Sequence, residues 1–186
     1  MEGNDQLKVI IPMLKKVGAG ILTEQLDCST PCALFTVSGV LDHMTSLASG
    51  YAPAFRGDPS PNDGGPSQSG DNDLPTRYQI ALDALLEAVQ SPGALQRTIE
   101  TPFGPMPGSM FARLVAFDGL IHGWDLATST QQAWDPPEDI VAEIDAFARQ
   151  AIAPSMRDGD AFSQETYAPP EATPLLRLVA FSGRSI

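Results

Sequence analysis

The sequence lacks the features that mark secreted and membrane proteins. Only two of its 186 residues are cysteines, Cys28 and Cys32, which is too few for the disulfide framework of a small secreted domain. No apolar run reaches the 18 or so residues of a transmembrane helix, and the N-terminus has no basic segment followed by a continuous apolar stretch. We therefore expect a cytoplasmic protein with no membrane partner.

Positive charge is also scarce, with 11 Lys and Arg residues against 23 Asp and Glu residues. The formal net charge is -12, which makes polyanions poor partners, so we expect no nucleic-acid binding. The sequence contains no Gly-rich phosphate loop and no GxSxG motif, which disfavours phosphoryl transfer and serine hydrolysis.

The apolar residues that are present recur at three-and-four spacing, which predicts an all-α fold. The predicted helices span 5–26, 36 to about 50, 75–90, about 108–128, 136–152 and, as a short helix, 174–182. A short extended run over 97–101 precedes the fourth helix and predicts a structured loop or hairpin. A chain of this length favours one domain, which we place over 1–186.

The segment 57–73, GDPSPNDGGPSQSGDND, separates the second and third predicted helices and contains no apolar residue. Burial cannot offset the entropy of ordering such a segment, so we expect a mobile surface loop. A helical bundle with one long crossover uses a connection of this kind. A role for the loop in partner binding is a further interpretation.

The helix predicted over 111–128 carries Asp118, His122 and Asp125 on one narrow stripe among apolar residues. Asp118 lies one turn before His122, and the other histidine of the chain, His43, lies at the edge of the apolar face of the second helix. If these two helices pack together, the three side chains form a divalent metal site with an open position. A single histidine on an apolar face is more often a hydrogen-bonded core residue, which is the alternative.

Asp125 has two interpretations. It accepts a hydrogen bond from His122 or from a backbone group and so fixes the imidazole tautomer, or it is a solvated or capping residue. Gly119 and Gly123 weaken the same helix, which indicates close packing of a neighbouring element or access for a ligand. The CSTPC segment over 28–32 is interpreted as structural, with Cys32 a small buried apolar side chain.

Three segments resemble a known family. TPCALFTVSGVLDHM over 30–44 and DGLIHGWDLA over 118–127 resemble two motifs of the mycothiol-dependent maleylpyruvate isomerase metal-binding domains. PPEATPLLRLVAFSGR over 169–184 is similar to the end of a small actinobacterial branch of metal-binding proteins. The resemblance implies a DinB/YfiT-like four-helix bundle with a long crossover between helices two and three and short extra helices. It also implies a divalent metal, zinc or nickel, with His43, Asp118 and His122 as ligands, although this family commonly has glutamate where Asp118 stands.

Together these observations favour a metal-binding protein that acts as a thiol-dependent transferase or isomerase on an electrophilic small molecule. A low-molecular-weight thiol such as mycothiol would be the co-substrate, and Asp125 would orient His122. The alternative is a metal-independent bundle that binds a small molecule, or a biosynthetic cyclase or isomerase that uses Asp118 and His122 as acid and base. We expect a monomer or a homodimer.

Overall fold

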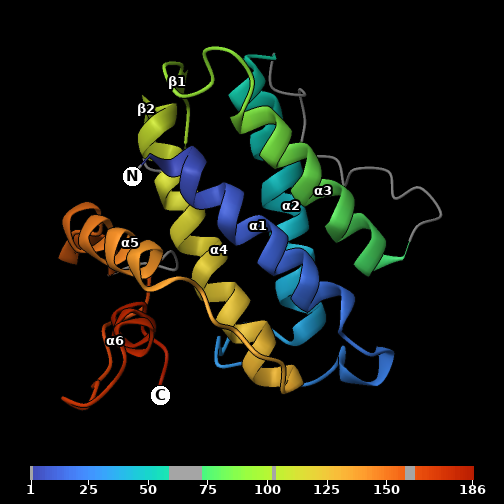
Figure 1. Ribbon diagram of the computed structural model, residues 1–186, viewed down its shortest axis with the longest axis vertical. Coiled ribbons are helices and arrows are strands. Elements are labelled where there is room, and N and C mark those ends of the chain that lie inside the picture. The colour runs from blue at the N-terminus through green and yellow to red at the C-terminus, as the bar shows by residue number, and fades with distance from the viewer. Residues whose placement is uncertain (1, 59–72, 102–103, 158–161) are drawn as a thin grey trace.

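A computed structural model describes residues 2–58, 73–101, 104–157 and 162–186. It confirms the all-α class, with one short antiparallel strand pair (Figure 1). In chain order the elements are α1 (Gly3–Ala19), η1 (Thr23–Gln25), α2 (Val37–Arg56), α3 (Leu74–Val89), β1 (Thr98–Ile99), β2 (Met106–Pro107), α4 (Gly108–Thr130), α5 (Glu138–Ala151), η2 (Pro154–Arg157) and α6 (Pro174–Phe181). Within the described ranges, no helix has the length and apolar character needed to cross a membrane.

The four long helices pack in two pairs, and this arrangement positions the candidate site. α1 lies along α4 and α3 lies along α2, while α1 also contacts α3 (Figure 1). α2 and α4 approach each other at far fewer positions, so space remains between them. α5 packs on α4, and α6 packs on α5, which places the C-terminal segment beside the α4 side of the molecule.

Local sequence signals account for several helix ends. The Thr36 hydroxyl accepts a hydrogen bond from the Gly39 N–H at 3.2 Å, which confirms the predicted start of α2. The Asp73 carboxylate caps α3 in the same way, at 3.0 Å from the Thr76 nitrogen. The hairpin predicted around 97–101 is also confirmed, because Thr98–Ile99 pairs antiparallel with Met106–Pro107.

Three predicted boundaries are wrong. α1 ends at Ala19 rather than near residue 26, since Gly18 and Gly20 weaken its last turn. α2 continues beyond residue 50 to Arg56, and its last turn tolerates Pro53 because Ala52 and Phe55 are buried against the core.

α5 begins at Glu138 with Pro137 at its N-cap, whereas the sequence predicted a start at residue 136. The ring of Pro137 disfavours helical backbone at Pro136, which excludes the earlier start. The predicted mobile crossover over 57–73 lies outside the described residues between 59 and 72.

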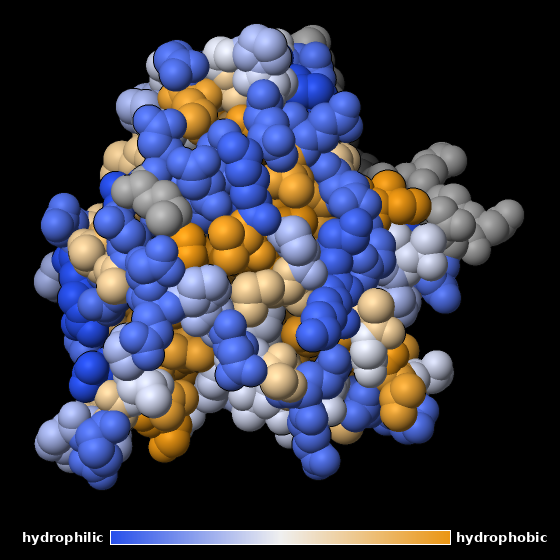
Figure 2. Space-filling model, in the orientation of Figure 1, coloured by the Kyte–Doolittle hydropathy of each residue, from blue (hydrophilic) through white to orange (hydrophobic). Residues whose placement is uncertain are grey.

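The exterior of the molecule is mostly hydrophilic. Figure 2 shows hydrophilic side chains over most of one face, with smaller hydrophobic areas between them. Large exposed apolar side chains such as Leu22, Ile80 and Tyr167 come from separate parts of the chain. Isolated apolar side chains of this kind are normal on a folded protein and indicate no binding surface.

The glycines of α4 serve close packing, which is one of the two roles expected for them. A Cβ at Gly119 would lie 3.2 Å from Leu14 Cδ1 of α1. At Gly123 a Cβ would collide with the indole of Trp134, a buried side chain that follows α4. Leu14 and Trp134 therefore pack directly against α4 at two positions that have no side chain.

We predict that Gly123→Ala destabilises the protein by up to about 2 kcal/mol, because overpacking against the Trp134 indole costs up to about 3 kcal/mol and the gain in helix propensity offsets about 1 kcal/mol of this. Gly50→Ala is the matched control, because no described atom outside its own helix backbone and chain neighbours lies within 4 Å of a Cβ built there. It should stabilise the protein. Urea unfolding measures both variants, and a Gly123→Ala protein as stable as Gly50→Ala would contradict the packing role.

Candidate metal centre

His122 is fixed on α4 by a carboxylate one turn further along the helix. Its Nδ1 lies 3.0 Å from Oδ2 of Asp125, and both side chains are buried. The Asp125 carboxylate can only accept a hydrogen bond when ionised, so Nδ1 carries the proton and donates. The lone pair of the neutral imidazole is then on Nε2, the nitrogen that faces away from Asp125.

Asp125 is fully buried and has a second partner from the C-terminal segment. Arg184 donates from Nη2 to Oδ2 at 2.8 Å and from Nε to Oδ1 at 3.3 Å. Burial acts to lower the pKa of Arg184, but the hydrogen bond and charge of Asp125 outweigh it, so this pKa is raised. The guanidinium therefore stays charged and balances the buried carboxylate.

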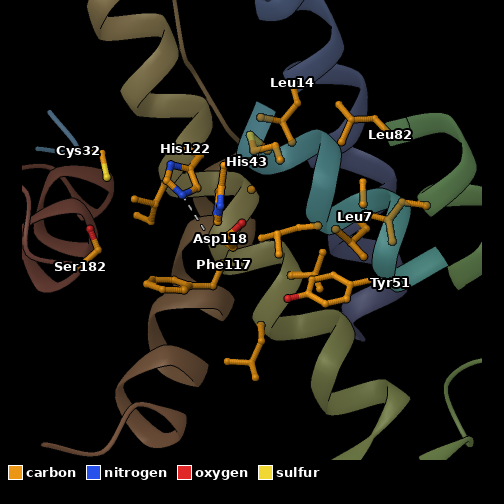
Figure 3. A pocket seen from close by; sticks show the side chains of 18 of the residues that line it. Leu7, Leu14, Cys32, His43, Tyr51, Leu82, Phe117, Asp118, His122 and Ser182 are labelled. Atoms are coloured by element: carbon orange, nitrogen blue, oxygen red, sulfur yellow. Dashed lines mark ion pairs between the residues drawn. The ribbon is translucent and has the colours of Figure 1, made fainter. Parts of the chain in front are cut away.

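His43 and Asp118 lie on the open side of His122. The Nε2 atom of His122 is 3.5 Å from Oδ1 of Asp118, and the two imidazole centroids are 5.1 Å apart. One ligand atom from each of the three residues lies within 4.8 Å of the other two. Figure 3 shows the three side chains pointing toward one another, with His43 reaching across from α2.

The start of α2 positions His43. The Phe35 ring stacks on the His43 imidazole, with centroids 5.0 Å apart and planes at 29°. A Cβ at Gly39 would lie 3.2 Å from the Phe35 ring, so the glycine leaves room for that ring. Burial lowers the pKa of His43, with the Asp118 charge partly opposing it, and the neutral imidazole that results is the form that ligates metals.

A second cluster shares His122 and consists of Cys32, His122 and Asp125. Burial raises the pKa of the Cys32 thiol, which disfavours the thiolate needed to bind a metal. Asp125 is already paired with Arg184, so a cation bound there would lie beside a guanidinium. Both clusters are compatible with metal binding, and these charges favour the one containing His43 and Asp118.

The candidate site lines a cavity of about 390 Å³ between the four long helices. Polar groups gather toward one end and apolar groups toward the other (Figure 3). Cys32 lies on one side of His122, whereas Leu7, Leu82 and Tyr51 lie on the other. A small molecule in the cavity would therefore contact the three candidate ligands and an apolar wall at the same time.

Comparison with curated proteins gives relatives from Mycobacterium tuberculosis. The chain is 31% identical over 169 residues to the uncharacterized protein Rv0738 of strain ATCC 25618 / H37Rv, and this alignment covers 90% of each chain. It matches the uncharacterized protein MT0763 of strain CDC 1551 / Oshkosh to the same extent. The chain belongs to the family of these mycobacterial proteins.

No model of a known protein family matches the chain, and no solved structure matches it. The names of the two relatives state no activity. The geometry of the site therefore carries the functional argument.

The structure brings together the three residues that the sequence singled out as ligands, and it places Asp125 behind His122. Sequence reasoning missed Arg184 and treated Cys32 as a structural residue. The signal for Arg184 was available in part, because a buried carboxylate requires a cationic partner and the chain has few Lys and Arg residues. Nothing in the local pattern of the CSTPC segment indicates that the half-buried Cys32 lies beside His122.

We predict that Arg184→Ala lowers the free energy of unfolding by about 3 kcal/mol, because it leaves the Asp125 carboxylate buried without its cation. Lys8→Ala is the control, since it removes the exposed Lys8–Asp5 pair and should cost less than about 1 kcal/mol. Urea unfolding measures both. When Asp125 is already replaced by Asn, Arg184→Ala should lower the free energy of unfolding by less, because no buried carboxylate is left without its cation. An unchanged decrease would show that Arg184 stabilises the protein through other contacts.

Proposed function

We propose that this protein binds one divalent metal ion, zinc or nickel, through His43, Asp118 and His122. The observation that carries the proposal is the 3.5 Å separation of His122 Nε2 and Asp118 Oδ1. With Nδ1 committed to Asp125, Nε2 presents a lone pair to a carboxylate oxygen, and two acceptors at this distance repel each other. A cation between them removes the repulsion.

The donor set fits such an ion. Two imidazole nitrogens and one carboxylate oxygen suit zinc and nickel, and three protein ligands leave a position open. Bonds of about 2.0–2.1 Å in tetrahedral geometry place ligand atoms about 3.3 Å apart, close to the observed separation. Asp118 is one methylene shorter than glutamate, and its Oδ1 still lies 3.5 Å from Nε2 of His122.

We also propose the DinB-like bundle and the thiol-dependent chemistry that the sequence resemblance implies. A divalent metal with an open position lowers the pKa of a low-molecular-weight thiol, of the mycothiol type, and so supplies thiolate near neutral pH. Asp125 and Arg184 hold the His122 imidazole in one tautomer and orientation. The cavity beside the site has room for the electrophilic small molecule that a transferase or isomerase of this kind would require.

One alternative satisfies the same contact without a metal. A proton on His122 Nε2 would make an imidazolium between Asp118 and Asp125, and Asp118 is 39% exposed and so accessible to a ligand. The protein would then bind a small molecule, or act as a cyclase or isomerase with Asp118 and His122 as acid and base.

We expect untagged protein to contain or bind close to one zinc or nickel per chain, measured by elemental analysis and by titration calorimetry. His43→Ala and His122→Ala should each weaken metal affinity by more than the 10–100-fold typical of losing a supporting residue. Cys32→Ser and Cys28→Ser should keep full affinity. Loss of metal in Cys32→Ser with retention in His43→Ala would move the site to the second cluster.

Thermal unfolding with and without a chelator separates the metal proposal from its alternative. A ligand at about 100 times its dissociation constant adds about 2.7 kcal/mol, so the chelator should lower the Tm of zinc-loaded wild type by roughly 5–10 °C. His122→Ala should not respond. A folded wild-type protein whose Tm changes with neither zinc nor chelator would favour the acid–base alternative.

A further inference from the structure

Different helices form the floor and the walls of the cavity beside the candidate metal centre. Its floor comes from α1 and α3, including Leu7, Leu14 and Leu82, which are almost fully buried. Its walls come from the facing sides of α2 and α4, where Leu47 and Val115 are half-buried. The loose approach of α2 to α4 therefore opens a space that the core side chains do not fill.

Water is a poor occupant of the apolar end of this cavity. A buried water molecule needs two to four polar partners, and apolar cavities of this kind stay dry or take up apolar ligands. Among the described residues that line the cavity, Arg184 is the only cation, and its guanidinium is paired with Asp125. A substrate with several charges would thus find no counter-charge away from the candidate metal ligands.

The Tyr51 hydroxyl is a further polar group of the cavity, and burial together with the charge of Asp118 raises its pKa. The Tyr51 hydroxyl has no hydrogen-bond partner in the described part of the chain, while its ring packs edge-on against Phe111 at 4.6 Å. Tyr51 is two helical turns beyond His43 on the same face of α2, about 12 Å along the axis. Figure 3 shows it on the opposite side of Asp118 from Cys32.

We propose that the cavity selects an elongated apolar substrate with a polar head at His43, Asp118 and His122 and a second oxygen that accepts a hydrogen bond from Tyr51. The contact of the polar head rests on the proposed metal function, whereas the apolar body and the Tyr51 contact do not. Small dicarboxylates do not match this cavity, because a second carboxylate would find no free counter-charge at the apolar wall.

The test uses zinc-loaded full-length protein and a series of n-alkyl hydroxamates from four to ten carbons, because a hydroxamate head binds zinc. Each added methylene should lower the dissociation constant about fourfold until the cavity is full. Leu47→Trp fills the cavity and should abolish this dependence on chain length, as should Val115→Phe from the opposite wall. Ile80→Trp adds the same bulk at an exposed site on α3 and should leave it unchanged.

The Tyr51 contact is tested with hydroxamates that carry a terminal hydroxyl. A hydroxamate whose alkyl chain ends in a hydroxyl should bind the apolar cavity less tightly than the plain alkyl hydroxamate. At the one chain length that brings this hydroxyl to Tyr51, the wild type should recover most of the lost affinity. Tyr51→Phe should lose this recovery and still bind the plain alkyl series as the wild type does. Equal behaviour of wild type and Tyr51→Phe at every length would overturn the Tyr51 assignment.

Failure of the metal proposal and failure of the substrate proposal give different results. If neither zinc nor nickel binds, the metal proposal fails, and n-alkanols of the same lengths then test the cavity in metal-free protein. Affinity that rises with alkanol length and is lost in Leu47→Trp and Val115→Phe supports the apolar site on its own. Zinc binding without any dependence on chain length overturns the substrate class while leaving the metal proposal intact.

Discussion

The rest of the site depends on one buried carboxylate. Asp125 is fully inside the protein, and an isolated carboxylate there would be strongly unfavourable. Two partners prevent this: His122 from the same helix and Arg184 from the C-terminal segment. Because Asp125 accepts the hydrogen bond from Nδ1–H of His122, the other ring nitrogen is directed toward His43 and Asp118. One network of ion pairs therefore connects Arg184 in the C-terminal segment with the candidate metal ligands.

Helix packing supplies the second requirement, which is space. The closest helix pairs are α1–α4 and α2–α3, and Gly119 of α4 leaves room for Leu14 of α1 in the first pair. α2 and α4 meet at few positions, so their facing sides line a cavity instead of closing against each other. The candidate ligands thus lie at the edge of the core, where a solute from outside has access to them.

Much of this arrangement is predictable from the sequence, and the remainder depends on long-range contacts. Apolar spacing predicts the helices, and the i, i+4 spacing of Asp118 and His122 on an apolar face indicates the site. The full length of α2 was not predictable, because burial of Phe55 overrides the local signals of Gly50 and Pro53. Arg184 lies 59 residues from Asp125 in the chain, so no periodicity connects them.

X-ray absorption spectroscopy at the zinc K-edge, on zinc-loaded protein free of added thiol, distinguishes a metal held by His43, Asp118 and His122 from one held by sulfur. We expect a first shell of nitrogen and oxygen at about 2.0–2.2 Å. A sulfur ligand at about 2.3 Å would instead assign the ion to the cluster that contains Cys32 and rule out the site at His43 and Asp118.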